Sequence, residues 1–217
     1  MRRIVFSLIS LLLPLSAMAS DKMSYYDVTI TNGSSSQVLT PPVVATHKAK
    51  ASVFSVGQPA SAELAHLAEN GDGVPLVSKL QTMQGVYQAT QGDAPGVLLP
   101  GHSVTIRVMA GKRARVSVVS MLASTNDGFI GLNGARLHGN MSSKMVGVYD
   151  AGSEANTEMC AHIPGPPCAM DSGNARMENG AEGFVSFHSG IRGNVDIPAG
   201  MDWRGDLALI SIKKVSD

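Results

Sequence analysis

The stretch YYDVTIT, Tyr25–Thr31, decides the fold class. Tyr26, Val28 and Ile30 fall on one face of an extended chain, and the polar residues between them fall on the other. This period of two is typical of a β-strand with one buried face. The turn-forming run Asn-Gly-Ser-Ser-Ser at 32–36 then ends the strand. We therefore predict that the chain opens with a half-buried strand.

Similar alternation or short apolar runs, bounded by turn residues, recur along the rest of the chain. They predict strands at Val38–His47, Ser103–Ala110, Arg115–Leu122, Met145–Asp150, Phe184–His188 and Leu207–Val215. Many short strands, 23 glycines and a charged fraction of only 16% favour an antiparallel β-sandwich over a fold in which strands alternate with helices. The predicted fold class is therefore all-β.

Two segments break the strand pattern. Pro59–Ala68 (PASAELAHLA) and Pro75–Met83 (PLVSKLQTM) carry leucines three to four residues apart, which is the spacing of a helix face. Asn-Gly-Asp-Gly at 70–73 ends the first segment, and Gly85 ends the second. We predict a short helical insertion that packs over one end of the sheets.

The first nineteen residues have the layout of a secretory signal peptide. Arg2 and Arg3 precede an apolar run at 4–15, and Ala-Met-Ala at 17–19 fits a cleavage site. A membrane span needs about 20 apolar residues, whereas this run is shorter. We predict cleavage after Ala19, a secreted or periplasmic protein, and a single domain over residues 20–217.

The charge balance argues against some classes of partner. Cleavage of the signal peptide leaves 15 of the 17 basic residues and all 17 acidic residues. No lysine-rich run is present, so we expect no nucleic-acid partner. No second hydrophobic run is long enough to span a bilayer, so we expect no membrane span after cleavage.

The two cysteines, Cys160 and Cys168, are close in sequence, and an exported chain meets an oxidising environment. We expect a local disulfide of modest stabilising effect, because the enclosed loop is short. Two free thiols or half of a metal site are the alternatives. The pair lies in Ala151–Gly183, the longest stretch without periodic apolar residues, and loops of this length are often functional.

Two segments place a carboxylate where a predicted strand gives way to a glycine-containing turn. The first is Ser124–Gly131, which contains Asp127, and the second is Asp150–Asn156, which contains Glu154. Loops cluster at the ends of a β-sandwich, so acids from two loops can converge there. Calcium accepts about six to eight oxygens from carboxylates, amides and backbone carbonyls, so it suits such a site. On spacing alone, a pair of plain turns is the simpler interpretation.

The order of motifs along the chain resembles that of the spondin N-terminal domain, and the two acidic turns are its most specific part. The motifs are Tyr26-x-Val28-x-Ile30, Leu39-Thr40-Pro41-Pro42 followed by His47, Asn126-Asp127-Gly128-Phe129-x-Gly131, Asp150-Ala151-Gly152-Ser153-Glu154, and a closing strand at Leu207–Ile212. The resemblance implies a C2-like β-sandwich with calcium bound at one end of the sheets. It also implies that the chain belongs with extracellular matrix proteins, adhesion proteins and exported bacterial proteins.

By the same resemblance, Asp127 corresponds to the acid of the family's Ser-Pro-Asp-Trp turn, and Asp150 and Glu154 to those of its Asp-Ala-Gly-Thr-Asp turn. Here Thr-Asn precedes Asp127 in place of Ser-Pro, Gly128 replaces the aromatic residue, and Glu154 is one methylene longer than aspartate. We therefore expect Asp127 and Asp150 to be the main ligands of Ca²⁺, with Glu154 and Asn156 as additional ligands.

These features favour a non-catalytic calcium-binding module for binding or adhesion at the cell envelope or outside the cell. Its partner would be an unknown protein or glycan. A metal-assisted hydrolase that combines the same acids with His162 or His188 is the alternative from another class, although the chain has neither H-E-x-x-H nor G-x-S-x-G. A third possibility is a structural envelope protein in which the cation only stabilises the loops.

Overall fold

A computed structural model describes residues 22–92, 96–137, 139–168 and 175–215, so the expected signal peptide lies outside the described residues. Ten strands, two α-helices and two short 3₁₀ helices are assigned in these ranges: β1 Ser24–Asn32, β2 Val43–His47, α1 Ala62–Asn70, α2 Val74–Thr82, β3 Val86–Gln91, β4 Ser103–Ala110, β5 Arg115–Met121, β6 Gly128–Arg136, β7 Met141–Val146, β8 Val148–Asp150, η1 Cys160–His162, β9 Ser186–Phe187, η2 Ala199–Met201 and β10 Ala208–Lys214. None of the helices in the described ranges has the length and hydrophobicity to cross a membrane.

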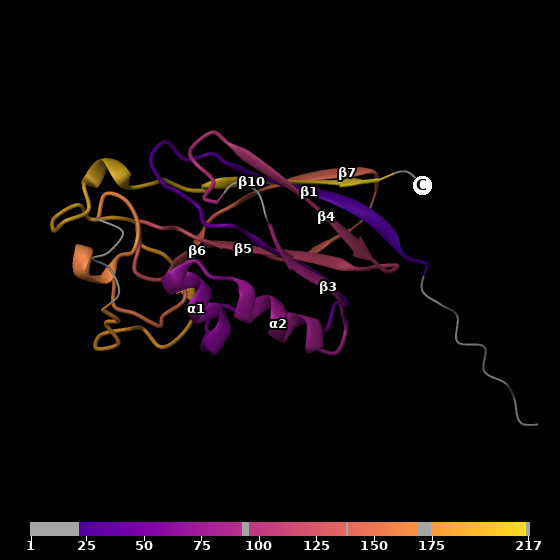
Figure 1. The fold of residues 1–217 in the computed structure, drawn as a ribbon, viewed down its shortest axis with the longest axis horizontal. Coiled ribbons are helices and arrows are strands. Elements are labelled where there is room, and N and C mark those ends of the chain that lie inside the picture. Colours follow the sequence, from indigo (N-terminus) through magenta and orange to yellow (C-terminus); the bar gives the residue numbers. More distant parts are fainter. Residues whose placement is uncertain (1–21, 93–95, 138, 169–174, 216–217) are drawn as a thin grey trace, which may run out of the picture.

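The strands form two antiparallel sheets that pack face to face, as Figure 1 shows. The four-stranded sheet has the order β4-β1-β10-β7, and the six-stranded sheet has the order β3-β2-β5-β6-β8-β9. This arrangement confirms the predicted all-β sandwich. β1 begins and β10 ends at the same end of the sandwich (Figure 1).

The main core lies between the two sheets. In β1, Val28 and Ile30 are fully buried, as the alternation in the sequence predicts. They pack in one cluster with Val44 of β2 and Ile130 of β6 from the opposite sheet. Apolar side chains on the inner faces of both sheets therefore drive the sandwich together.

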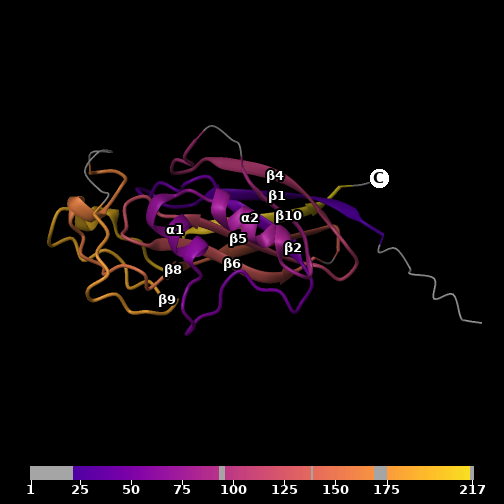
Figure 2. The ribbon, with the colours of Figure 1, turned by 60° about the horizontal axis from the view of Figure 1, so that its bottom comes forward.

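The two predicted helices are present, but their position differs from the prediction. They cover the outer face of the six-stranded sheet instead of one end of the sandwich (Figure 2). Leu64 and Leu67 of α1 and Leu76 of α2 pack in a second core with Val119 and Phe129 of the sheet. The central strands β2 and β5 are consequently buried on both faces.

Some strand boundaries also differ from the prediction. The sequence predicts one strand over Met145–Asp150, whereas the structure divides this stretch at Gly147 between β7 of one sheet and β8 of the other. Val146 and Val148 are both buried because the chain crosses between the sheets at this point. The predicted strand Val38–His47 is regular only in β2, and Phe184–His188 only in β9. β3 and β6 are additional strands that the pattern did not indicate.

Candidate metal centre

The pairing of β6 with β8 brings the two acidic turns together. Asp127 directly precedes β6, and Asp150 is the last residue of β8. Because these strands are antiparallel, Gly128 faces Asp150 in the ladder, and the Ala151 N–H donates to the Asp127 carbonyl at 3.1 Å. Residues that are 23 positions apart in sequence thus become neighbours at one end of the six-stranded sheet.

The Asp127 carboxylate is completely buried, and its two oxygens have different surroundings. Oδ2 accepts the backbone N–H of Ser153 at 2.7 Å, the Ser153 hydroxyl at 3.2 Å and the backbone N–H of Glu154 at 2.9 Å. Oδ1 is buried and has no hydrogen-bond partner among the described residues. A buried carboxylate oxygen without a partner is costly, so Oδ1 is suited to a ligand that the protein itself does not supply.

Asp150 is also buried, and both of its oxygens are bonded. Its Oδ1 accepts the backbone N–H of Gly152 at 2.7 Å, which closes the acidic turn. Its Oδ2 accepts the side-chain amide of Asn156 at 2.5 Å. The predicted residue Asn156 is thus in the second turn as a partner of Asp150, and its own amide oxygen is the atom that would be available for a cation.

The electrostatics of the pair favour a positive ligand. Burial raises the pKa of the Asp127 carboxyl to about 7, and the nearby charge of Asp150 adds to the increase, against the hydrogen bonds from Ser153 and Glu154. Burial likewise raises the pKa of Asp150. Two adjacent buried carboxylates destabilise each other when both are ionised, and a divalent cation removes that cost.

Glu154 contributes to the site in a different way from the other predicted residues. Its backbone N–H holds Asp127, but its side-chain Oε1 accepts the backbone N–H of Met177 at 3.1 Å. Burial raises the pKa of this carboxyl to about 7, against the bond from Met177. The Glu154 side chain thereby fastens the acidic turn to the segment that begins at residue 175.

The donor set fits calcium in its chemistry. Asp127, Asp150 and the amide oxygen of Asn156 are hard oxygen donors, and the turn backbone adds carbonyl groups of the kind that Ca²⁺ accepts. Within the described ranges, no group of three or more His, Cys, Asp or Glu side chains is arranged to hold a metal ion. A cation at this site would therefore depend on two carboxylates together with neutral oxygens.

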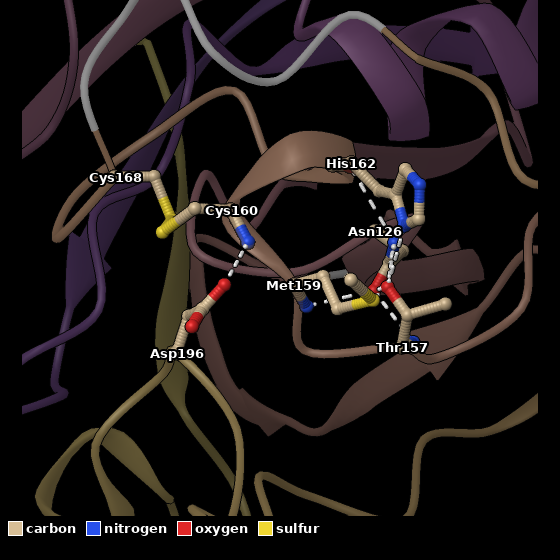
Figure 3. Close-up of a disulfide and its surroundings, with 7 residues drawn as sticks. All are labelled: Asn126, Thr157, Met159, Cys160, His162, Cys168 and Asp196. Atoms are coloured by element: carbon tan, nitrogen blue, oxygen red, sulfur yellow. Dashed lines mark hydrogen bonds between the residues drawn. A yellow bond between two sulfur atoms is a disulfide. The ribbon is translucent and has the colours of Figure 1, made fainter.

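A disulfide-bonded loop, residues 160–168, lies beside Asn126, the neighbour of Asp127 (Figure 3). Cys160 and Cys168 form the expected disulfide, and the Cys160 N–H donates to Asp196 Oδ2 at 2.8 Å. Asn126, the neighbour of Asp127, accepts the backbone N–H of Thr157 at 3.1 Å and donates its amide to the His162 carbonyl at 3.4 Å. The disulfide loop is therefore linked to the acidic turns through Asn126.

The two histidines that the hydrolase alternative requires form their hydrogen bonds with groups other than Asp127 and Asp150. His162 Nδ1 bonds to the Thr157 hydroxyl at 2.9 Å. His188 Nδ1 accepts the Gly190 N–H at 3.0 Å, and burial lowers the pKa of this imidazole to about 4. Among the described residues, no hydrogen bond joins either imidazole to Asp127 or Asp150.

One structural acid near the site was not indicated by the sequence. Glu158 is buried, and its carboxylate accepts the backbone N–H groups of Arg192 at 2.6 Å and Gly193 at 2.9 Å. Its backbone has a positive φ of 55°, which is uncommon outside glycine. Glu158 lies between Asn156 and the disulfide and thus fixes the loop around 190 to this end of the sandwich. No local motif distinguishes such an acid from an exposed one.

Comparison with known proteins agrees with this architecture. The family model described as Spondin_N matches residues 34–168, a range that includes Asp127, Asp150, Glu154 and both cysteines. No curated protein matches the chain. The match covers more than half of the sequence and contains both acidic turns, and the chain belongs to the spondin N-terminal domain family.

Proposed function

We propose that this domain is a calcium-dependent binding module that acts outside the cytoplasm and performs no catalysis. The observation that carries the proposal is Asp127 Oδ1, which is buried beside a second carboxylate and has no partner among the described residues. A Ca²⁺ ion would neutralise the two carboxylates and complete the coordination of Oδ1. Asp127, Asp150 and the Asn156 amide oxygen would hold it.

The same residues connect cation binding to the shape of the surrounding loops. Asp127 bonds to Ser153 and Glu154 of the second turn, and Asn126 bonds to Thr157 and His162 of the disulfide loop. A cation that fixes the Asp127 carboxylate would therefore also fix these loops. Ordered loops at one end of a β-sandwich are a common recognition surface, because the sheets hold them in place.

Family membership supports the location and the general class of this function. The spondin N-terminal domain indicates an extracellular, adhesion-type module, and the Cys160–Cys168 disulfide is consistent with an extracellular protein. The partner we propose is a protein or a glycan outside the cytoplasm.

Thermal unfolding with excess calcium and with a chelator tests the proposal. A ligand that binds only the folded protein at about 100 times its dissociation constant adds about 2.7 kcal/mol, which raises the melting temperature of a domain of this size by roughly 5–10 °C. Asp150→Asn should lose most of this increase. Asp206→Asn is the matched control because Asp206 is exposed. No increase in the wild type, or an equal increase in Asp150→Asn, would contradict the proposal.

A further inference from the structure

Two cavities of about 530 Å³ each lie next to each other at one end of the sandwich, and basic side chains line both. Arg113, Arg115 and Arg136 line the first cavity. Arg113 also lines the second, which contains the remaining cations of this end. We call the six cationic side chains the basic pole: Lys22, Lys112, Arg113, Arg115, Arg136 and Lys214.

The fold brings these cations together from four separate segments. Lys112 and Arg113 occupy the turn between β4 and β5. Arg115 faces Arg136 across the β5–β6 ladder, and Lys214 is at the end of β10. In the sequence only Lys112, Arg113 and Arg115 are close together, and the fold adds Lys22, Arg136 and Lys214 to them.

The basic pole and the candidate metal centre are at opposite ends of the same strand. β6 starts at Gly128, next to Asp127, and ends at Arg136. At about 3.3 Å per residue, its nine residues separate the two sites by roughly 25–30 Å. The molecule therefore has an acidic end and a basic end, and the two can be tested independently.

Four cations of the basic pole have no acidic counter-charge among the described residues. In the described part of the chain, no carboxylate lies within 4.0 Å of the side-chain nitrogens of Lys112, Arg113, Arg115 or Arg136. The ion pairs seen among the described residues involve Arg107, Lys79, Arg176 and His66, which lie outside the basic pole. Cations grouped around a cavity without counter-charges attract anionic ligands.

The backbone at Arg113 is a second, independent observation. Arg113 has a positive φ of 59°, and Glu158 is the only other non-glycine residue with a positive φ among those described. Glycine adopts this conformation without cost, whereas arginine does not. The turn nevertheless has arginine at this position, and its side chain lines both cavities. Strained backbone of this kind is often associated with binding sites.

We propose that the basic pole binds an anionic glycan, a sugar polymer that carries phosphate or sulfate groups. Arginine recognises such groups with two parallel N–H donors, and two adjacent cavities suit a ligand with several anionic groups. This inference rests on the proposed binding function and names its ligand class. Glycan binding at the basic pole would not require calcium, because the candidate metal centre lies at the far end of β6.

The cavity linings favour a glycan over a lipid surface. None of the exposed large apolar side chains of the described residues lines either cavity, and such side chains are what a peripheral protein inserts into a bilayer. The second cavity is instead lined by Ser24, Tyr26 and Asn140, whose hydroxyl and amide groups can form hydrogen bonds with sugar hydroxyls.

Binding of the purified full chain to heparin, a sulfated glycan, tests the proposal, with neutral dextran as the negative control. We expect heparin to bind and the affinity to decrease steeply with added salt. The double variant Arg113→Asn, Arg136→Gln should bind roughly tenfold or more weakly, since two charge-assisted contacts are lost. Asparagine tolerates the positive φ at position 113, so the variant is expected to fold.

The matched control is Lys144→Gln, Arg204→Gln, which removes the same charge from exposed positions outside the basic pole. It should retain wild-type affinity for heparin. Equal weakening in both double variants, or no heparin binding by the wild type at low salt, would overturn the proposal. Tighter binding to double-stranded DNA or to phosphatidylglycerol vesicles than to heparin would also overturn it. None of these outcomes affects the calcium test, which reports on the opposite end of the molecule.

Discussion

The Glu154 backbone N–H donates to the Asp127 carboxylate at 2.9 Å and thereby connects two loops whose bonded residues are 27 positions apart. The Ser153 N–H donates to the same oxygen, Oδ2. The second turn therefore wraps around Asp127 from one side, whereas Oδ1 on the other side has no partner among the described residues. We propose Oδ1 as the ligand position because of this asymmetry.

Replacement of Asp127 by asparagine should separate calcium binding from folding. The amide oxygen can still accept the Ser153 and Glu154 N–H groups, but the charge beside Asp150 is removed. We expect the chelator-treated variant to melt at the wild-type temperature or above it, because a buried carboxylate next to another one is destabilising. The calcium-dependent increase should disappear.

Calorimetric melts with calcium and with chelator provide the measurement. Asp127→Ala is a useful comparison, because alanine leaves the Ser153 and Glu154 N–H groups without an acceptor and should reduce stability by about 1–3 kcal/mol. A calcium-dependent increase that persists in Asp127→Asn would show that the cation binds elsewhere.

Gly152→Ala should disrupt the second acidic turn. Gly152 has a positive φ of 67°, and a Cβ atom at this position would lie 2.3 Å from the backbone oxygen of Phe184. Because backbone atoms cannot move aside as a flexible side chain can, we expect a loss of about 3 kcal/mol or more and weaker calcium binding.

Gly205→Ala is the control for this substitution. Gly205 also has a positive φ, 74°, but a Cβ atom would meet nothing within 4 Å. Its cost should be only about 1 kcal/mol, from the backbone conformation alone. Urea unfolding measures both free energies. Equal losses in the two variants would mean that contact with Phe184 has no role.

The sequence predicted the sandwich, both helices, the disulfide and the convergence of Asp127 with Asp150. These features depend on local patterns and on the rule that loops cluster at the ends of sheets. Strand β6 escaped prediction because Gly128, Gly131 and Gly134 look like turn residues. In the structure a Cβ atom at Gly131 would lie 2.8 Å from the Tyr149 ring, so this glycine makes room for a side chain from another strand.

Other features could not be predicted because they arise from pairing between distant segments. The Glu154 side chain looks like a third ligand in the sequence, but its bond to the Met177 N–H depends on the path of a long irregular loop. Likewise, Arg115 and Arg136 are 21 residues apart and become direct partners only through the β5–β6 ladder. The first contact depends on the course of a loop and the second on strand pairing, and composition alone carries no information about either.

His188 should make stability depend on pH between about 6.5 and 4. Burial lowers its folded-state pKa from 6.5 to about 4, although the charges of Glu182, Glu158 and Asp202 oppose the decrease. Because the unfolded chain takes up the proton first, the contribution is fully present above pH 6.5 and is lost as pH falls through this range. The loss is at most about 3 kcal/mol.

Denaturant unfolding of the wild type and His188→Asn at several pH values isolates this contribution. Asparagine can accept the Gly190 N–H as His188 Nδ1 does, but it cannot be protonated in this range. The difference in stability between the two proteins should therefore change with pH below 6.5 and stay constant above it. His102→Asn, at an exposed position, serves as the control. A constant difference throughout would contradict the burial of the neutral imidazole.

Removal of the disulfide by Cys160→Ser, Cys168→Ser should reduce stability without abolishing calcium binding. The two cysteines are eight residues apart, and closure of so short a loop contributes about 2–3 kcal/mol. Cys168 also packs with Ile163, Ile191 and Ile197, so the loss of its buried sulfur adds to the cost. The calcium-dependent increase in melting temperature should persist, because β6 and β8 position Asp127 and Asp150, and the disulfide loop hydrogen-bonds to the neighbouring residue Asn126. Treatment of the wild type with a reductant should reproduce the effect of the double variant, whereas the variant itself should not respond.

If the variant lost calcium binding while it remained folded, the disulfide loop would have to contribute ligands directly, and the centre would extend beyond the two acidic turns.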